Sequence, residues 1–225
     1  MSIVVIDRIK EFVQNLDLSS EVLEISNDGT NTTLKVGNVF HIRAFDAPYR
    51  RSVLIDGDSY DVVSVNTLDN VVVVEGVITD ATIYKVPNPF FFHGTLISTA
   101  NEINCLDPNQ KTPMIYLNEI IDGERPINSD LAYIGRVRLA FADYYSNDYT
   151  REQHYEIVIR PLQKLVDYVF SRWEGEGCLS FIDNPKDKTV PKWGTITNKG
   201  TSKKIFNMYL DAIEWDAPRI RFCKC

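Results

Sequence analysis

The segment LAYIGRVRLAF at residues 131–141 decides the fold we expect, because its apolar and polar residues alternate along the chain. Leu139 and Phe141 fall on one face, with Gly135 in the same register, while Arg136 and Arg138 fall on the other. This alternation is typical of a strand that buries one face and leaves the other wet or in contact with acidic groups. We therefore expect a sheet that is covered on one face.

Two amphipathic segments predict the helices that cover this face. The stripe in residues 3–16 consists of Ile6, Ile9, Val13 and Leu16. A second stripe runs through residues 151–173, where Pro161 should kink or restart the helix. Because a helix of about 14 residues is marginal in water on its own, each stripe must dock on other elements.

Residues 19–86 have a different pattern, in which turn signals recur between short runs rich in Val, Ile, Thr, Phe and Tyr. A spacing of roughly 8–12 residues between turns is typical of a small antiparallel sandwich or barrel. Pro87 and Pro89 end this segment. We therefore predict an α+β protein with two domains. A core of residues 1–18 and 87–225 packs two helices on one face of an antiparallel sheet, and 19–86 forms an inserted all-β domain.

Two segments outside the β-domain lack a clear period. Residues 98–113 are polar and are expected to be irregular, and 183–204 is expected to be a long loop with six lysines. Loops longer than about 12–15 residues are usually functional or disordered. Residues 205–222 are expected to form two strands joined by a tight turn at Ala217 and Pro218.

The composition is that of an ordinary soluble protein, with 44% apolar and 24% charged residues and a formal charge of −7. This balance disfavours disorder and excludes a wholly basic nucleic-acid binder. The longest apolar runs are far shorter than the ~20 residues of a membrane helix, and we find no signal peptide. The four cysteines do not form a disulfide framework in a chain of this size, which favours a reducing compartment.

Patterns that would carry catalysis or bind a metal are weak. The three histidines are His41, His93 and His154. None has the spacing of metal ligands, and the glycine loops of nucleotide sites and the nucleophile elbow are missing. Cys223 and Cys225 with Cys178 are a weak soft-metal candidate. We predict no enzyme activity, no catalytic residue, no cofactor and no metal; an enzyme would need a cleft that gathers histidines with carboxylates.

Basic and aromatic residues are better candidates for contacts with partners. A run of three phenylalanines in a loop needs either a core pocket or a partner surface. The lysines of 183–204 fit a solvated loop, a protein contact or a phosphate contact. The candidate interface residues are Phe90, Phe91, Phe92, Arg136, Arg138, Lys186, Lys188, Lys192, Trp193, Arg219 and Arg221.

The helix 3–16, the strand 131–141, the helical residues 160–166 and the terminal strands to 222 together resemble a known family. They look like tail-terminator and tail-completion ring proteins of the tailed-phage neck, including ring proteins of crAss-like phages. Residues 88–95 are also similar to sequences of this family. The inserted β-domain departs from the minimal terminator. The resemblance carries no catalytic residue to this chain.

The resemblance implies a structural virion protein of the neck or tail, assembled in the host cytoplasm. Its implied partners are further copies of itself in a cyclic homo-oligomer and neighbouring portal, adaptor or tail ring proteins, with no membrane. DNA would pass through the lumen without specific binding, which suits an acidic protein because phosphate contacts would hold DNA. The alternative is a carbohydrate- or peptide-binding β-module that stacks ligands on Tyr49, Tyr60 and Tyr84.

Overall fold

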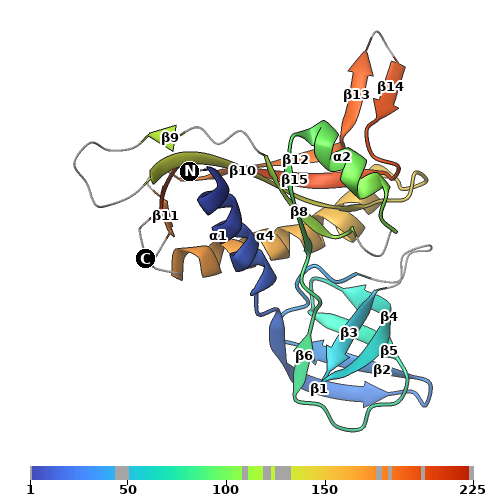
Figure 1. Cartoon of the computed structure of the whole chain (residues 1–225). Helices are drawn as coiled ribbons and strands as arrows, with labels where there is room; N and C mark the ends of the chain where they lie inside the picture. Colours follow the sequence, from blue (N-terminus) through green and yellow to red (C-terminus); the bar gives the residue numbers. More distant parts are fainter. Residues whose placement is uncertain are drawn as a thin grey trace.

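The chain folds as a mixed α+β protein in which a closed antiparallel barrel is attached to one face of a larger sheet (Figure 1). The structure is a computed structural model. It describes residues 2–43, 51–107, 111–118, 123–124, 133–175, 179–181, 184–198 and 201–222. The α+β class expected from the sequence is confirmed at this level.

The barrel consists of six strands in the order β1-β2-β5-β4-β3-β6. Their bounds are β1 Ser19–Asn27, β2 Asn31–Val36, β3 Ser52–Ile55, β4 Asp58–Asn66, β5 Val71–Glu75 and β6 Ile83–Lys85. Alternate residues point inward, as Leu34 and Val36 on β2 and Val72 and Val74 on β5 show by their burial. All barrel strands lie between residues 19 and 85, within the segment expected to form the β-domain.

The second sheet is organised around β10, the strand that contains most of the segment 131–141. Its strands are β7 Phe90–Gly94, β8 Met114–Asn118, β9 Gly123–Glu124, β10 Tyr133–Tyr144, β11 Leu179–Phe181, β12 Lys186–Trp193 and β15 Leu210–Phe222. β10 pairs antiparallel with β15 along its whole length and with β8 on its other side. β7 pairs parallel with β8, so the sheet is mixed and the prediction of a purely antiparallel sheet was wrong.

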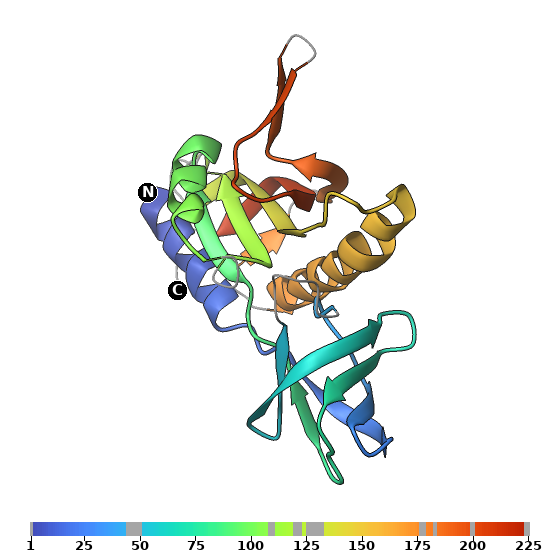
Figure 2. The same cartoon turned by 90° about the vertical axis from the view of Figure 1, so that its right-hand side faces the viewer.

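Helices cover the two faces of this sheet unequally. α1 Ser2–Gln14 and α4 Arg160–Gly175 share an apolar core with one face of β10 and with the barrel interior. α2 Leu96–Asn104 packs in a smaller core on the other face, as Figure 2 also shows. The barrel is attached on the side of α1 and α4, so one continuous apolar core joins it to the sheet.

Two segments expected to be irregular are regular elements. The phenylalanine run forms β7 rather than a loop, and α2 occupies the first half of 98–113. α2 begins where the Thr95 side chain accepts a hydrogen bond from the backbone N–H of Ser98. Such a cap satisfies one of the free amides of the first turn and defines the start of the helix.

The prediction of a long loop at 183–204 is also wrong, because this segment contains β12 and a hairpin of β13 Thr195–Asn198 and β14 Thr201–Lys204. β12 is held by pairing with β15. Residues 205–222 do not form two strands either, since β15 runs through Pro218. The register between β10 and β15 shifts opposite this proline, and such a bulge allows a residue without an N–H to remain in a strand.

The segment 151–173 is helical but divided. It begins with α3 Arg151–Gln153, continues as the π-helix η2 His154–Ile159 and then becomes α4. The change to α-helix falls immediately before Pro161, which lies in the first turn of α4. Because α4 continues directly from η2, the proline does not begin a new helix; it follows the wider π-helical turn, and prolines and π-helical turns are both places where the regular hydrogen-bond ladder of a helix is interrupted.

Candidate functional site

The barrel is joined to the sheet by a buried group of charged side chains. Asp143 on β10 lies between two arginines of the barrel segment, Arg43 and Arg51. Arg43 Nε is 3.1 Å from Asp143 Oδ2, and Arg51 Nη2 donates to Asp143 Oδ1 at 2.7 Å. The side chains of Arg43, Arg51 and Asp143 are 3%, 9% and 2% exposed, respectively. Arg51 also donates to the carbonyl of Thr112, so it holds the barrel to the segment that leads into β8.

Burial and charge at this junction shift two pKa values. Burial alone would raise the pKa of Asp143, but Arg43 and Arg51 outweigh it and lower the pKa from 3.8. Burial, reinforced by Arg51, lowers the pKa of His41 from 6.5 to about 4, against the raising effect of Asp143. His41 is therefore neutral and Asp143 ionised at neutral pH.

A second buried carboxylate lies directly opposite the first. Asp211 on β15 is the register partner of Asp143, and it is 0% exposed. Its Oδ2 is 2.5 Å from His154 Nδ1, and its Oδ1 accepts the backbone N–H of Lys192 at 2.9 Å. The ring of Tyr145 packs 4.5 Å from the imidazole of His154. Asp211 thereby ties η2 and β12 to β15.

These groups form a structural connection between elements. The structure brings His41 and His154 to neighbouring carboxylates, whereas His93 is exposed on β7. Both carboxylates already have their oxygens engaged by side chains or backbone of this chain. Within the described ranges, no group of three or more His, Cys, Asp or Glu side chains could hold a metal ion. Cys178, Cys223 and Cys225 lie outside those ranges.

The helix α4 adds polar contacts between the barrel and the part of the chain that contains the larger sheet. Lys164 Nζ donates to Asn70 Oδ1 in the turn between β4 and β5, at 2.5 Å. The hydroxyl of Tyr168 donates to the carbonyl of Asp17, and its ring meets that of Phe40 edge-on at 5.0 Å. With the buried charges, these contacts fix the orientation of the barrel relative to the sheet.

The face of the sheet opposite α4 carries several of the predicted interface residues. Arg136 donates through Nε and Nη2 to Asp216, and Arg138 Nε is 3.7 Å from the same carboxylate. The hydrogen bond from Arg136 chiefly lowers the pKa of Asp216, although its partial burial acts in the opposite direction. In the register of β12 with β15, Lys186 lies opposite Asp216 and Lys188 opposite Glu214. Thus Arg136 and Arg138 share a single carboxylate, that of Asp216, within the chain.

The remaining predicted interface residues divide between core and surface. Phe92 and Trp193 are 6% and 7% exposed and belong to the core beneath α2, so they are not exposed anchors. Phe90 and Phe91 are half-buried, while Lys186, Lys188 and Lys192 are exposed. Arg219 and Arg221 lie on β15, and their side chains are outside the described residues.

The aromatic residues of the alternative β-module do not form a stacking surface among the described residues. Tyr84 is 0% exposed inside the barrel, and Tyr60 is half-buried. Tyr49 lies outside the described ranges. The suggestion that Tyr84 stacks on a ligand was therefore wrong.

The hairpin of β13 and β14 projects from the sheet on the side away from the barrel (Figures 1 and 2). Its strands pair with each other from Thr195↔Lys204 to Asn198↔Thr201. Within the part of the chain that the structure describes, neither strand pairs with another strand. An isolated two-stranded hairpin is at best marginally stable in water, so this one is expected to gain order from a partner surface.

The backbone and ring contacts at the base of the hairpin fix the direction in which it projects. Gly194, between β12 and β13, has φ of +72°, and the rings of Trp193 and Phe206 stack beside it at 5.2 Å. The carbonyl of Gly194 accepts the backbone N–H of Ile205 at 2.9 Å. A Cβ added at Gly194 would lie 2.3 Å from Phe206 Cε2.

Gly194→Ala should lower the free energy of unfolding by about 1–3 kcal/mol, because the buried ring of Phe206 must move and the left-handed backbone becomes strained. Urea unfolding followed by circular dichroism measures this loss. Gly29→Ala is the matched control, since Gly29 has φ of +91° but no atom within 4 Å of an added Cβ. Equal losses in the two variants would show that the contact with Phe206 does not matter.

Comparison of the chain with protein-family models, curated proteins and solved structures gave no match. In the described part of the chain, no helix has both the length and the apolar character that crossing a membrane requires.

Proposed function

We propose that this chain is a structural subunit of the neck or tail of a tailed-phage virion, where it forms a homo-oligomeric ring as a tail terminator or completion protein. The observation that carries the proposal is the projecting hairpin of β13 and β14, which has no supporting strand in the described part of the chain. A subunit of a ring needs an element that reaches beyond its own body, and this hairpin is placed to do so.

The arrangement of the core supports the same proposal. α1 and α4 lie together on one face of the sheet, which is the arrangement that the likeness to terminator cores implies. The barrel is locked to that core through Arg43, Arg51 and Asp143. A subunit whose two bodies keep a fixed orientation can repeat the same contact around a closed ring.

The charge of the chain suits a ring through which DNA passes. With a formal charge of −7, the chain as a whole repels phosphate, which favours sliding over binding. The proposed protein partners are further copies of this chain and the adjacent portal, adaptor or tail ring proteins. The proposal includes no cofactor and no catalytic step.

Native mass spectrometry and electron microscopy of the purified full chain, alone and with proteins of the neck, test the proposal. We expect a cyclic oligomer with one fixed copy number and its incorporation at the head-to-tail region of particles. A chain that stays monomeric at all concentrations and never joins particles would overturn it.

A further inference from the structure

One end of the barrel forms a strongly acidic surface, which we call the acidic pole. It consists of the turns 27–31, 55–60 and 75–83, which hold no lysine or arginine. Its five acidic residues, all exposed, are Asp28, Asp56, Asp58, Glu75 and Asp80. The three turns lie together, since Gly76 N–H donates to the carbonyl of Thr30, and Thr82 donates to the carboxylate of Asp56.

The acidic pole is rigid and has an apolar centre. Asp28 accepts the backbone N–H groups of Thr30 and Asn31, and Asp56 accepts that of Ile83, so these turns are held in one conformation. Val77 and Ile83 in the same turns are 51% and 54% exposed. Exposed apolar side chains with a charged rim are the usual anatomy of a protein interface.

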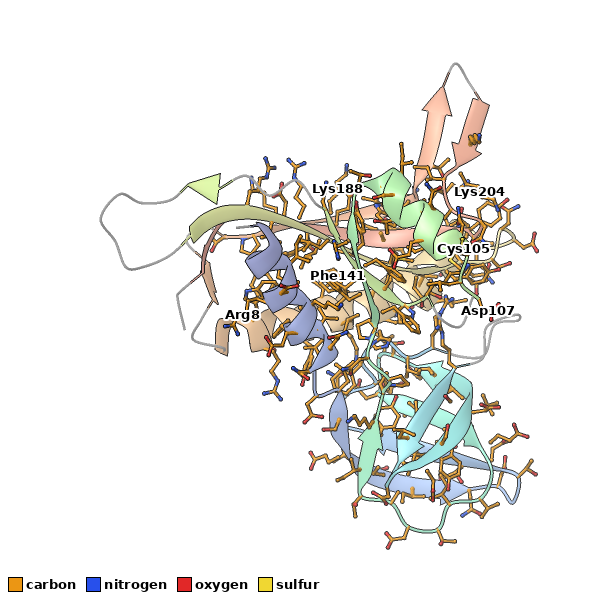
Figure 3. All side chains as sticks on the ribbon, in the orientation of Figure 1. Arg8, Cys105, Asp107, Phe141, Lys188 and Lys204 are labelled. Carbon is orange, nitrogen blue, oxygen red and sulfur yellow. The ribbon has the colours of Figure 1, made fainter. Side chains whose placement is uncertain are left out.

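The opposite end of the molecule is basic, and we call residues 186–198 and 201–204 the basic pole. These residues include five lysines and one aspartate and form β12, β13 and β14. Lys186, Lys188, Lys192, Lys203 and Lys204 are exposed. Figure 3 shows Lys188 and Lys204 on the far side of the sheet from the barrel. The basic pole therefore cannot pair with the acidic pole of its own chain.

We propose that the basic pole of one copy, including the hairpin of β13 and β14, docks on the acidic pole of the next copy. The proposal rests on the ring function proposed above and names the two surfaces that form the ring contact. The two poles carry formal charges of +4 and −5, so each offers the charge that the other needs. Docking also gives the isolated hairpin the partner surface that its stability requires.

This contact joins two different surfaces of identical chains. Contacts of that kind repeat from copy to copy and produce a closed ring when the rotation between neighbours closes, or a filament when it does not. The buried charges at the junction between barrel and sheet fix the angle between the two poles. They thereby set the rotation between neighbouring copies.

Charge reversal within the full chain tests the proposal. Variant K203E/K204E lowers the formal charge of the basic pole from +4 to 0, and variant E75K/D80K changes that of the acidic pole from −5 to −1. We expect each variant to associate with itself about tenfold or more weakly than the wild type in analytical ultracentrifugation at low salt. An equimolar mixture of the two double variants should recover association between unlike chains, because the unchanged basic pole of E75K/D80K can dock on the unchanged acidic pole of K203E/K204E.

The matched control is R8E/K10E, which changes the net charge as much as K203E/K204E but alters exposed residues of α1. It should associate like the wild type. Recovery in the mixture of the two double variants requires that both are folded, so it separates lost contact from lost structure.

Three outcomes would overturn the proposal. Rings of either double variant that form as well as those of the wild type would refute the named surfaces and leave the ring function standing. Binding of duplex DNA that K203E/K204E abolishes while association persists would assign the basic pole to nucleic acid. A wild type that never associates would overturn both the contact and the ring.

Discussion

Asp143→Asn should lower the free energy of unfolding by about 3–5 kcal/mol, which is the usual cost of removing one partner from a buried ion pair. The carboxylate of Asp143 is 2% exposed and is the acidic partner of both Arg43 and Arg51. Asparagine keeps the shape of the side chain but leaves two buried guanidinium groups without a counter-charge. Because these groups lie between the barrel and the sheet, we expect the two bodies to lose their fixed orientation as well.

Urea unfolding of the wild type and the variant, followed by tryptophan fluorescence, measures this loss. The matched control is Glu24→Gln, which removes the carboxylate of an exposed ion pair with Lys35 and should cost less than about 1 kcal/mol. The variant R43M/R51M/D143L should recover part of the stability, since it replaces all three buried charges with apolar side chains. Equal stability of Asp143→Asn and the wild type would mean that the junction does not depend on this charge.

The alternation of 131–141 was enough to predict β10, because Val137, Leu139 and Phe141 are buried on one face while Arg136 and Arg138 lie on the other. Ala140 and Ala142 are also buried, so both faces are covered from residue 139 on. The stripe of α1 was equally clear, since Ile9, Val13 and Leu16 are all buried in the core. In both cases the pattern within one short segment reflects contacts that the segment makes along one continuous face. Local patterns of this kind can be recognised without knowing the partner.

The missed elements depend on neighbours that are distant in the sequence. β12 begins with Lys186, Asp187 and Lys188, which are exposed and carry no apolar alternation, and its strand character comes from pairing with β15. β15 continues past Pro218 only because a bulge accommodates that residue. α2 was detectable in principle, since Thr95 is a favourable N-cap immediately before the helix.

The charged junction could not be predicted from any single segment. Asp143 and Arg51 are separated by 92 residues along the chain, and no local spacing connects them. One signal was present, because the alternation of β10 places Asp143 on the same face as Leu139 and Phe141. A carboxylate at a position that the pattern assigns to the core requires a buried partner, although the pattern does not say which.

The stability of the protein should fall as the pH is lowered from about 7.5 to about 5, by about 2 kcal/mol, through His41 alone. The pKa of His41 is about 4 in the folded chain and 6.5 for an unperturbed imidazole. Between these values the unfolded chain binds a proton that the folded chain does not. Protons therefore favour unfolding in this window. At pH values below the folded pKa, the full loss of stability through His41 reaches about 3 kcal/mol.

Asp143 acts in a lower pH window and can be separated from His41. Its folded pKa lies below 3.8, so the stability that it contributes is complete above that value and is lost only as the pH falls through the folded pKa. The loss between about pH 7.5 and about pH 5 therefore reports on His41 and not on this carboxylate.

His41→Gln should remove this part of the pH dependence, because glutamine does not titrate. Urea unfolding of the wild type and the variant at both pH values measures the free energy of unfolding. The change in this free energy between the two pH values is then compared for the two proteins, and this comparison is independent of any loss that the substitution causes at every pH. An NMR titration of the His41 ring gives a second measurement and should show the imidazole remaining neutral down to about pH 5. If the ring titrates near its unperturbed value of 6.5, or if the variant keeps the wild-type slope, burial of His41 at the barrel junction does not control the acid sensitivity of the fold.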